Sequence, residues 1–204
     1  MNKKRLDMDG PFLGFLVKFG QLIVLSALWL LGCIPVFTIC TSCAALYHAV
    51  ILSVRGGQGS PIKEFRKCYR AGLLDGAVLS LILVGALVGL EAVSVYLMHS
   101  LIPTGVICVL MILDIFLLIY VGPIMARFHL GVKETLKLSF VLSLQYAHYT
   151  LVFLIGTLAL IALQVFVLPA ATVLFLPGVW CLVISFLMEK ALNHYAPVDD
   201  DLAD

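Results

Sequence analysis

Charged side chains are scarce in this sequence. Only 12% of its 204 residues are Asp, Glu, Lys or Arg, against roughly 25% in an ordinary soluble domain. Hydrophobic residues make up 62% of the chain, and the mean hydropathy is +1.11. With 13 basic and 12 acidic side chains, a soluble domain of this length would lack the polar groups needed to cover its surface. The composition therefore predicts an integral membrane protein.

Basic side chains are absent from three long stretches, which are residues 19–54, 71–126 and 138–189. A helix that crosses ~30 Å of hydrocarbon needs about 20 residues, so the second and third stretches are each long enough for two crossings. Turn-forming residues divide them, near residues 99–105 and around Pro169. These two stretches together predict four membrane spans.

The first stretch could form one overlong span or two short ones joined at residues 32–35, where Gly and Pro occur. Loops rich in Lys and Arg stay cytoplasmic, so the N-terminus and residues 55–70 should lie on the same side of the membrane. That placement requires an even number of crossings between them and favours two helices. Five crossings, with a re-entrant first segment, are the alternative.

The sequence thus predicts an all-α polytopic bundle of about six transmembrane helices in a bacterial plasma membrane, with both termini cytoplasmic. Residues 1–196 are expected to form a single transmembrane domain, and residues 197–204 an acidic disordered tail. The predicted spans are 15–34, 37–54, 73–98, 103–126, 147–168 and 170–188.

Two segments between the spans, residues 60–70 and 130–140, each carry a Lys-Glu pair and spaced apolar residues. Both are predicted to form short amphipathic helices that lie on the cytoplasmic side at the lipid headgroups. The similarity of the two segments also permits an internal repeat. Membrane lipid, rather than nucleic acid, is the expected partner of the basic side chains. The candidate headgroup or partner contacts are Arg55, Lys63, Arg66, Lys67, Arg70, Arg127 and Lys133.

Two acidic residues fall inside predicted spans. Asp114 lies near the middle of one span and Glu91 in the outer half of the preceding one. A carboxylate at the bilayer centre costs about 2.5 to 3.5 kcal/mol on insertion scales, so such residues point to function. A short turn joins the two spans, and both acids could therefore bind one cation, proton or sugar hydroxyl group. Alternatively, each acid is protonated or hydrogen-bonded at a helix contact.

Gly85 and Gly89 form a GxxxG pattern, which allows two helix backbones to approach closely. Packing within the bundle is favoured over a dimer or partner interface. Cys40 and Cys43 form a C-x-x-C pattern, with His48 further along the same span. Zinc would need four ligands, and nothing else in the sequence completes a set. We therefore interpret both cysteines as small packing residues and expect no metal.

Motifs of common enzyme classes are absent. The chain has no P-loop, no dinucleotide-binding fingerprint, no HExxH and no Ser-centred nucleophile elbow. We therefore expect no catalytic residues, no cofactor and no enzymatic activity.

Several short segments resemble those of the YesL family of bacterial membrane proteins. They are Trp29 to Ile39, Ala44 to His48, Val54-Arg55, Ala126 to Phe128 and Val132-Lys133. The resemblance extends from Phe15 to Tyr195, and it departs from the family pattern at Cys40 to Cys43. It implies a small plasma-membrane protein, often encoded beside genes for carbohydrate uptake and polysaccharide degradation, with no established activity.

Three functions are compatible with this sequence. The favoured one is a non-enzymatic accessory component linked to carbohydrate uptake, with a transporter permease as its partner. The alternative is a small carrier or channel that uses Asp114 and Glu91. A membrane enzyme that uses Asp75 or Glu64 with His129 ranks last, because these residues form no paired-carboxylate or metal motif.

Overall fold

The computed structural model describes residues 11–57, 59–96, 101–128, 130–146, 150–152, 154–157, 159, 177–186 and 188–189. Within these ranges all regular structure is helical and no strand occurs. The prediction of an all-α protein is confirmed for this part of the chain.

The first hydrophobic stretch forms a helical hairpin. Helix α1 (Pro11–Cys33) ends before Pro35, and a continuous helical run follows, made of η1 (Val36–Thr38), α2 (Ile39–Ala49) and η2 (Val50–Arg55). The Thr38 hydroxyl ties the turn together, because it lies 2.7 Å from the carbonyl oxygen of Gly32 and 2.8 Å from that of Pro35. The predicted break between two helices is present, and of the two only the second is long and apolar enough to count as a membrane span.

Helix α3 (Pro61–Ala71) is amphipathic, as predicted. Pro61 occupies the first helical position, where its missing N–H costs no hydrogen bond. Phe65 and Cys68 are buried against the α1–α2 hairpin. The basic side chains of α3 lie on its other side, exposed.

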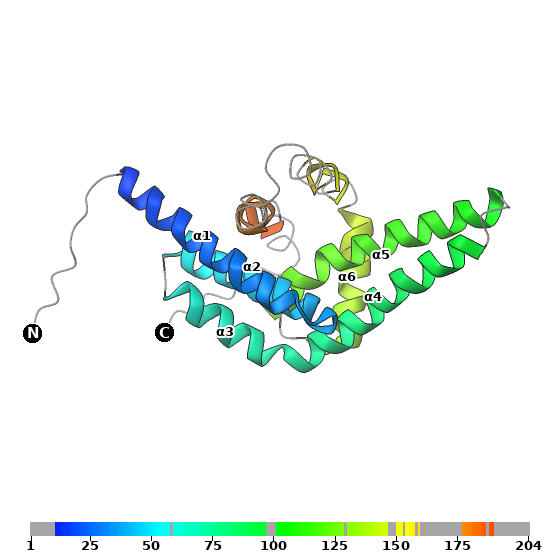
Figure 1. Ribbon diagram of the computed structural model, residues 1–204, viewed down its shortest axis with the longest axis horizontal. Coiled ribbons are helices and arrows are strands. Elements are labelled where there is room, and N and C mark those ends of the chain that lie inside the picture. Colours follow the sequence, from blue (N-terminus) through cyan, green and yellow to red (C-terminus); the bar gives the residue numbers. More distant parts are fainter. Residues whose placement is uncertain are drawn as a thin grey trace, which may run out of the picture.

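Helices α4 (Leu73–Tyr96) and α5 (Leu101–Phe128) form a long hairpin that extends away from the other helices, as Figure 1 shows. α4 begins at Leu73, and only Gly72 separates it from α3. The first half of α4 and the second half of α5 pack against α2 in the centre of the molecule. The outer ends of both helices are mostly exposed.

Helix α6 (Val132–Gln145) differs from the short headgroup helix predicted at residues 130–140. It is longer, and its exposed side becomes apolar after Lys137, with Phe140, Val141 and Leu144. Its buried side carries hydroxyl groups, from Thr135, Ser139 and Ser143. A helix that buries hydroxyls and exposes apolar side chains suits a lipid environment, because lipid accepts the apolar side and the bundle accepts the polar side.

Three helices are long and apolar enough to cross a membrane: Val36–Arg55, Leu73–Tyr96 and Gly105–Phe128. Segments Val132–Gln145 and Thr150–Thr157 would make a fourth span together, but the chain bends by 91° between them. The apolar helices Val17–Cys33 and Pro177–Phe186 are shorter. The described residues therefore support three to four spans in a membrane protein and do not confirm six. Most of the predicted span 147–168, and the tail 197–204, lie outside these residues.

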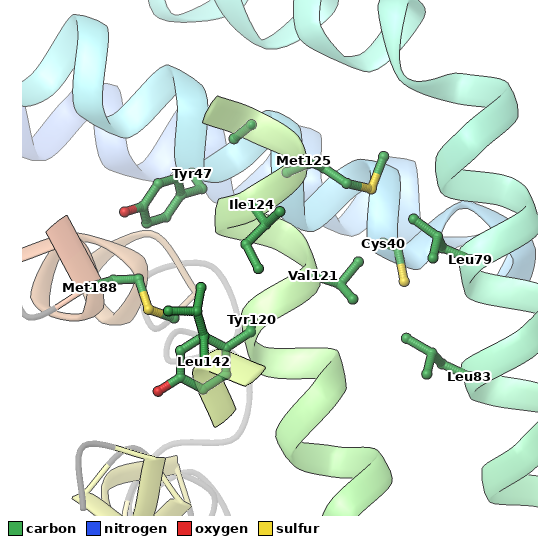
Figure 2. Close-up of a cluster of buried hydrophobic side chains, with 12 residues drawn as sticks. Cys40, Tyr47, Leu79, Leu83, Tyr120, Val121, Ile124, Met125, Leu142 and Met188 are labelled. Atoms are coloured by element: carbon green, nitrogen blue, oxygen red, sulfur yellow. The ribbon is translucent and has the colours of Figure 1, made fainter. Parts of the chain in front are cut away.

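The centre of the molecule is a packed cluster where α2, α4, α5 and α6 meet, shown in Figure 2. Val121 and Ile124 of α5 are fully buried there. In Figure 2, Cys40 of α2 lies between Val121 and Leu79 of α4. Glycines let the helix backbones approach: a Cβ on Gly122 would lie 3.3 Å from the Cβ of Cys43.

Candidate functional site

Asp114 is a buried carboxyl group at the junction of α2, α4 and α5. Its side chain is 7% exposed, and its Oδ2 atom has no hydrogen-bond partner. It lies close enough to Cys40 of α2 for an electrostatic interaction. The Cys40 backbone N–H in turn donates a 2.9 Å hydrogen bond to the Ser80 hydroxyl of α4. An unpaired carboxylate is costly in such surroundings, so Asp114 is a candidate binding point for a proton or a cation.

Further unpaired hydroxyl groups lie along the α2–η2 run. Among the described residues, the buried side-chain oxygens of Thr41, Tyr47 and Ser53 have no hydrogen-bond partner, and Ser139 of α6 is a fourth case. Buried polar groups are normally hydrogen-bonded, so these oxygens mark a polar interior between the helices. None of these hydroxyl side chains was among the site residues predicted from the sequence. Their signal was a helix with several hydroxyl side chains in an otherwise apolar stretch.

Glu91 lies apart from Asp114. Its side chain is exposed on the outer part of α4, where its carbonyl oxygen accepts a 2.8 Å hydrogen bond from Ser94. Counted at 1.5 Å per residue from the connected ends of α4 and α5, Asp114 lies roughly 12 Å further along the hairpin than Glu91. The structure therefore does not bring the two predicted acids together.

Gly85 and Gly89 face open space. A Cβ added to either would meet no atom of the described residues within 4 Å. The expected packing of this GxxxG pattern inside the bundle is thus not observed in the described part of the chain. Gly76, nine residues before Gly85 on the same helix, packs closely instead, since a Cβ there would lie 3.1 Å from the Cα of Thr41.

The basic residues predicted to contact headgroups divide into two groups. Those on α3 and the start of α6 are exposed, and these are Lys63, Arg66, Lys67, Arg70 and Lys133. Arg127 is half-buried at the end of α5, with its guanidinium 5.7 Å from the centre of the Phe128 ring. Arg55 is held by the C-terminal part of the chain, where its Nη1 lies 2.6 Å from Oε2 of Glu189. Only the first group offers unobstructed charge to a membrane surface.

Glu189 was not among the predicted site residues. It ends the last stretch without basic residues, and it lies 134 positions from Arg55. Tyr47 is also close enough to interact electrostatically with Glu189, Arg55 and Arg127. Charged and polar groups from α2, η2, α5 and the C-terminal segment around Glu189 thus lie near one another.

The C-x-x-C cysteines are free thiols that pack against neighbouring helices. The indole N–H of Trp29 donates to Cys43 Sγ at 3.4 Å. His48 does not face them, because its Nε2 lies 3.9 Å from Oε2 of Glu64. Among the described residues, no three His, Cys, Asp or Glu side chains could hold a metal.

The enzyme hypothesis named Asp75 or Glu64 together with His129. Asp75 is exposed at the start of α4, Glu64 is beside His48, and His129 lies outside the described residues. On α3, burial raises the pKa of the Cys68 thiol to about 11, so this thiol is protonated at neutral pH.

Residues 22–91 match a family described as "Protein of unknown function, DUF624". The matched segment contains most of the α1–α2 hairpin, all of α3 and most of α4, and it ends before α5 and Asp114. No curated protein and no solved structure shows a significant match to the chain.

Proposed function

We propose that this protein is a non-enzymatic accessory component of a bacterial plasma membrane, which docks through α4 onto the transmembrane helices of a carbohydrate-transporter permease. The observation that carries this proposal is the exposed face of α4. The face lies on a helix long enough to cross the membrane, and the family match includes most of it.

The exposed face of α4 has the spacing of a helix-packing seam. Leu74, Val78, Leu81, Gly85 and Val88 follow one another at intervals of four and three residues, and all are exposed. Intervals of this kind place side chains along one line that a second helix can follow. Gly85 and Gly89 leave room for the backbone of a second helix to approach α4 closely. A helix that faces only lipid does not need such room. The surface thus suits a partner helix better than lipid alone.

The link to carbohydrate uptake is supported by the resemblance to the YesL family, whose members are often encoded beside such genes. The exposed basic side of α3 supports a fixed orientation, since Lys63, Arg66, Lys67 and Arg70 would lie against the anionic cytoplasmic leaflet. With the six spans predicted from the sequence, both chain ends would then be cytoplasmic.

The test is purification of the tagged protein in mild detergent from its own host, with mass spectrometry of the co-purifying proteins. Permease subunits are expected in stoichiometric amounts. The double variant Gly85→Leu/Gly89→Leu fills the open space on α4 and should abolish their recovery. Val109→Leu enlarges an exposed side chain on α5 instead and should leave recovery unchanged. A wild-type preparation without permease subunits would refute the accessory function.

A carrier function is the second candidate, and the unpaired Oδ2 of Asp114 favours it. An ionisable residue inside a bundle is a natural binding point for a coupling proton or cation. Asp114→Asn should then abolish uptake of radiolabelled carbohydrate while the protein level stays constant. Because Glu91 is exposed and distant, Glu91→Gln is the matched control and should retain uptake. Uptake that survives Asp114→Asn would exclude this candidate.

A further inference from the structure

A pocket of about 340 Å³ lies between α1, η2 and the helix at Pro177–Phe186. It is distinct from the environment of Asp114 and from the exposed face of α4. Its lining residues are Lys18, Phe19, Leu22, Val54, Arg55, Leu182 and Phe186. The volume falls at the small end of ligand pockets, which span roughly 300 to 1,000 Å³.

Arg55 is fixed at the wall of this pocket. It ends the π-helical segment η2, where the Gly56 N–H bonds to the Ile51 carbonyl oxygen at 2.9 Å. π-helical turns frequently occur at functional sites. The Arg55 guanidinium lies 4.2 Å from the centre of the Phe186 ring, and its Nη1 contacts Glu189 and Ser185. The side chain is therefore held in one orientation.

All hydrogen bonds of Arg55 to described residues use Nη1. The N–H groups on Nη2 and Nε remain for another acceptor, and guanidinium binds phosphate through two parallel hydrogen bonds. Lys18, exposed on α1, adds a second positive charge at the pocket. Lys18 and Arg55 together outweigh the single negative charge of Glu189, so the pocket favours an anion.

The remaining lining is apolar, with Phe19, Leu22, Val54, Leu182 and Phe186. A free inorganic anion would gain nothing from these side chains. A phospholipid would use both parts, since its phosphate would meet Arg55 and Lys18 while its first acyl carbons would cover the apolar wall. The pocket also lies near the start of α1 and the end of η2. The chain continues from η2 into α3, the helix with the exposed basic side.

We infer that this pocket binds the headgroup of one anionic phospholipid from the leaflet that α3 contacts. Arg55 binds the phosphate through Nη2 and Nε, and Lys18 attracts it by charge. The lipid joins α1, η2 and the C-terminal helix, three segments that are far apart in the sequence.

The test uses the purified full-length chain in an uncharged detergent, titrated with phosphatidylglycerol, phosphatidylcholine or inorganic phosphate and followed by native mass spectrometry. We expect one phosphatidylglycerol per chain and much weaker binding of phosphatidylcholine. Lys18→Gln should weaken phosphatidylglycerol binding about fivefold, the effect of one basic side chain near an anionic lipid. Arg55→Lys retains the charge and the ion pair with Glu189, but it should weaken binding because it loses the paired N–H groups.

Lys137→Gln is the matched control, because it removes an exposed charge from α6, outside the pocket. It should leave the affinity for phosphatidylglycerol within twofold of the wild type, and so support a localised site. Equal weakening by Lys18→Gln and Lys137→Gln would overturn the inference in favour of general surface attraction. Binding of phosphatidylcholine as tightly as phosphatidylglycerol, or of inorganic phosphate as tightly as the lipid, would overturn it as well.

Discussion

The helical run Val36–Arg55 and helix α4 are both long and apolar enough to cross a membrane, yet they occupy opposite environments. In an apolar stretch of 18 residues, 61% of the residues of the first helical run are buried, and only 17% of those of α4. The buried run contains Thr41, Ser42 and Ser53, whereas the exposed surface of α4 is mostly Leu, Val and Ile. In a membrane the solvent is as apolar as any core, so polar side chains gather inside the bundle and the most apolar helix can lie outside.

Two leucines of α4 are expected to show the largest difference in unfolding free energy between a buried and an exposed position. Leu79 is fully buried in the central cluster, and Leu81 is 71% exposed. Leu79→Ala should lower the free energy of unfolding by about 2 to 4 kcal/mol, because it leaves a cavity. Leu81→Ala should change it by less than about 0.5 kcal/mol. Unfolding in mixed micelles by titration with sodium dodecyl sulfate measures both, and similar losses would contradict the burial described for α4.

Two glycines of α4 provide the next contrast. Gly76→Leu should destabilise the protein by about 1 to 3 kcal/mol, because the new side chain collides with Thr41 of α2. Gly85→Leu should have little effect on unfolding, since the space around Gly85 is open. The same micelle titration compares them. A folded, fully stable Gly76→Leu variant would show that α2 and α4 do not approach as closely as described.

The smallest expected effect concerns two serines. Ser80 accepts the hydrogen bond of the Cys40 N–H, whereas Ser94 only donates to the carbonyl oxygen of Glu91 on its own helix. Ser80→Ala should cost about 1 kcal/mol of unfolding free energy, because it leaves a buried N–H unpaired. Ser94→Ala should be neutral in the same measurement. Equal values for the two variants would mean that the contact between Cys40 and Ser80 does not stabilise the fold.

Local features of the fold were predictable from the sequence. Pro35 and Gly32 marked the end of α1, and the Lys-Glu pair with spaced apolar residues in segment 60–70 marked α3. Each of these signals acts within a few residues, so neighbouring side chains suffice to recognise it. The number of spans was less predictable, because hydrophobic length alone does not show where the chain bends by 91° after α6.

The residues that form the site could not be predicted from local sequence patterns. Glu91 and Asp114 are both intramembrane acids by position, but the rotation of each helix about its axis decides that one is exposed and the other buried. Gly76 and Gly85 are both small residues of one helix, but they differ in their distance from α2. Gly76 packs against α2, whereas Gly85 faces open space. The pair Arg55–Glu189 joins residues 134 positions apart, which no local pattern indicates.

Docking of α4 onto a permease through its exposed face is tested most directly by photo-crosslinking in the native host. A photoreactive amino acid at Val88, which is 64% exposed beside Gly85 and Gly89, is compared with one at Val109, which is 61% exposed on α5. We expect a crosslink to a carbohydrate-permease subunit from position 88 and none from position 109. Crosslinks to lipid alone from position 88 would contradict it and leave α4 as a lipid-facing helix.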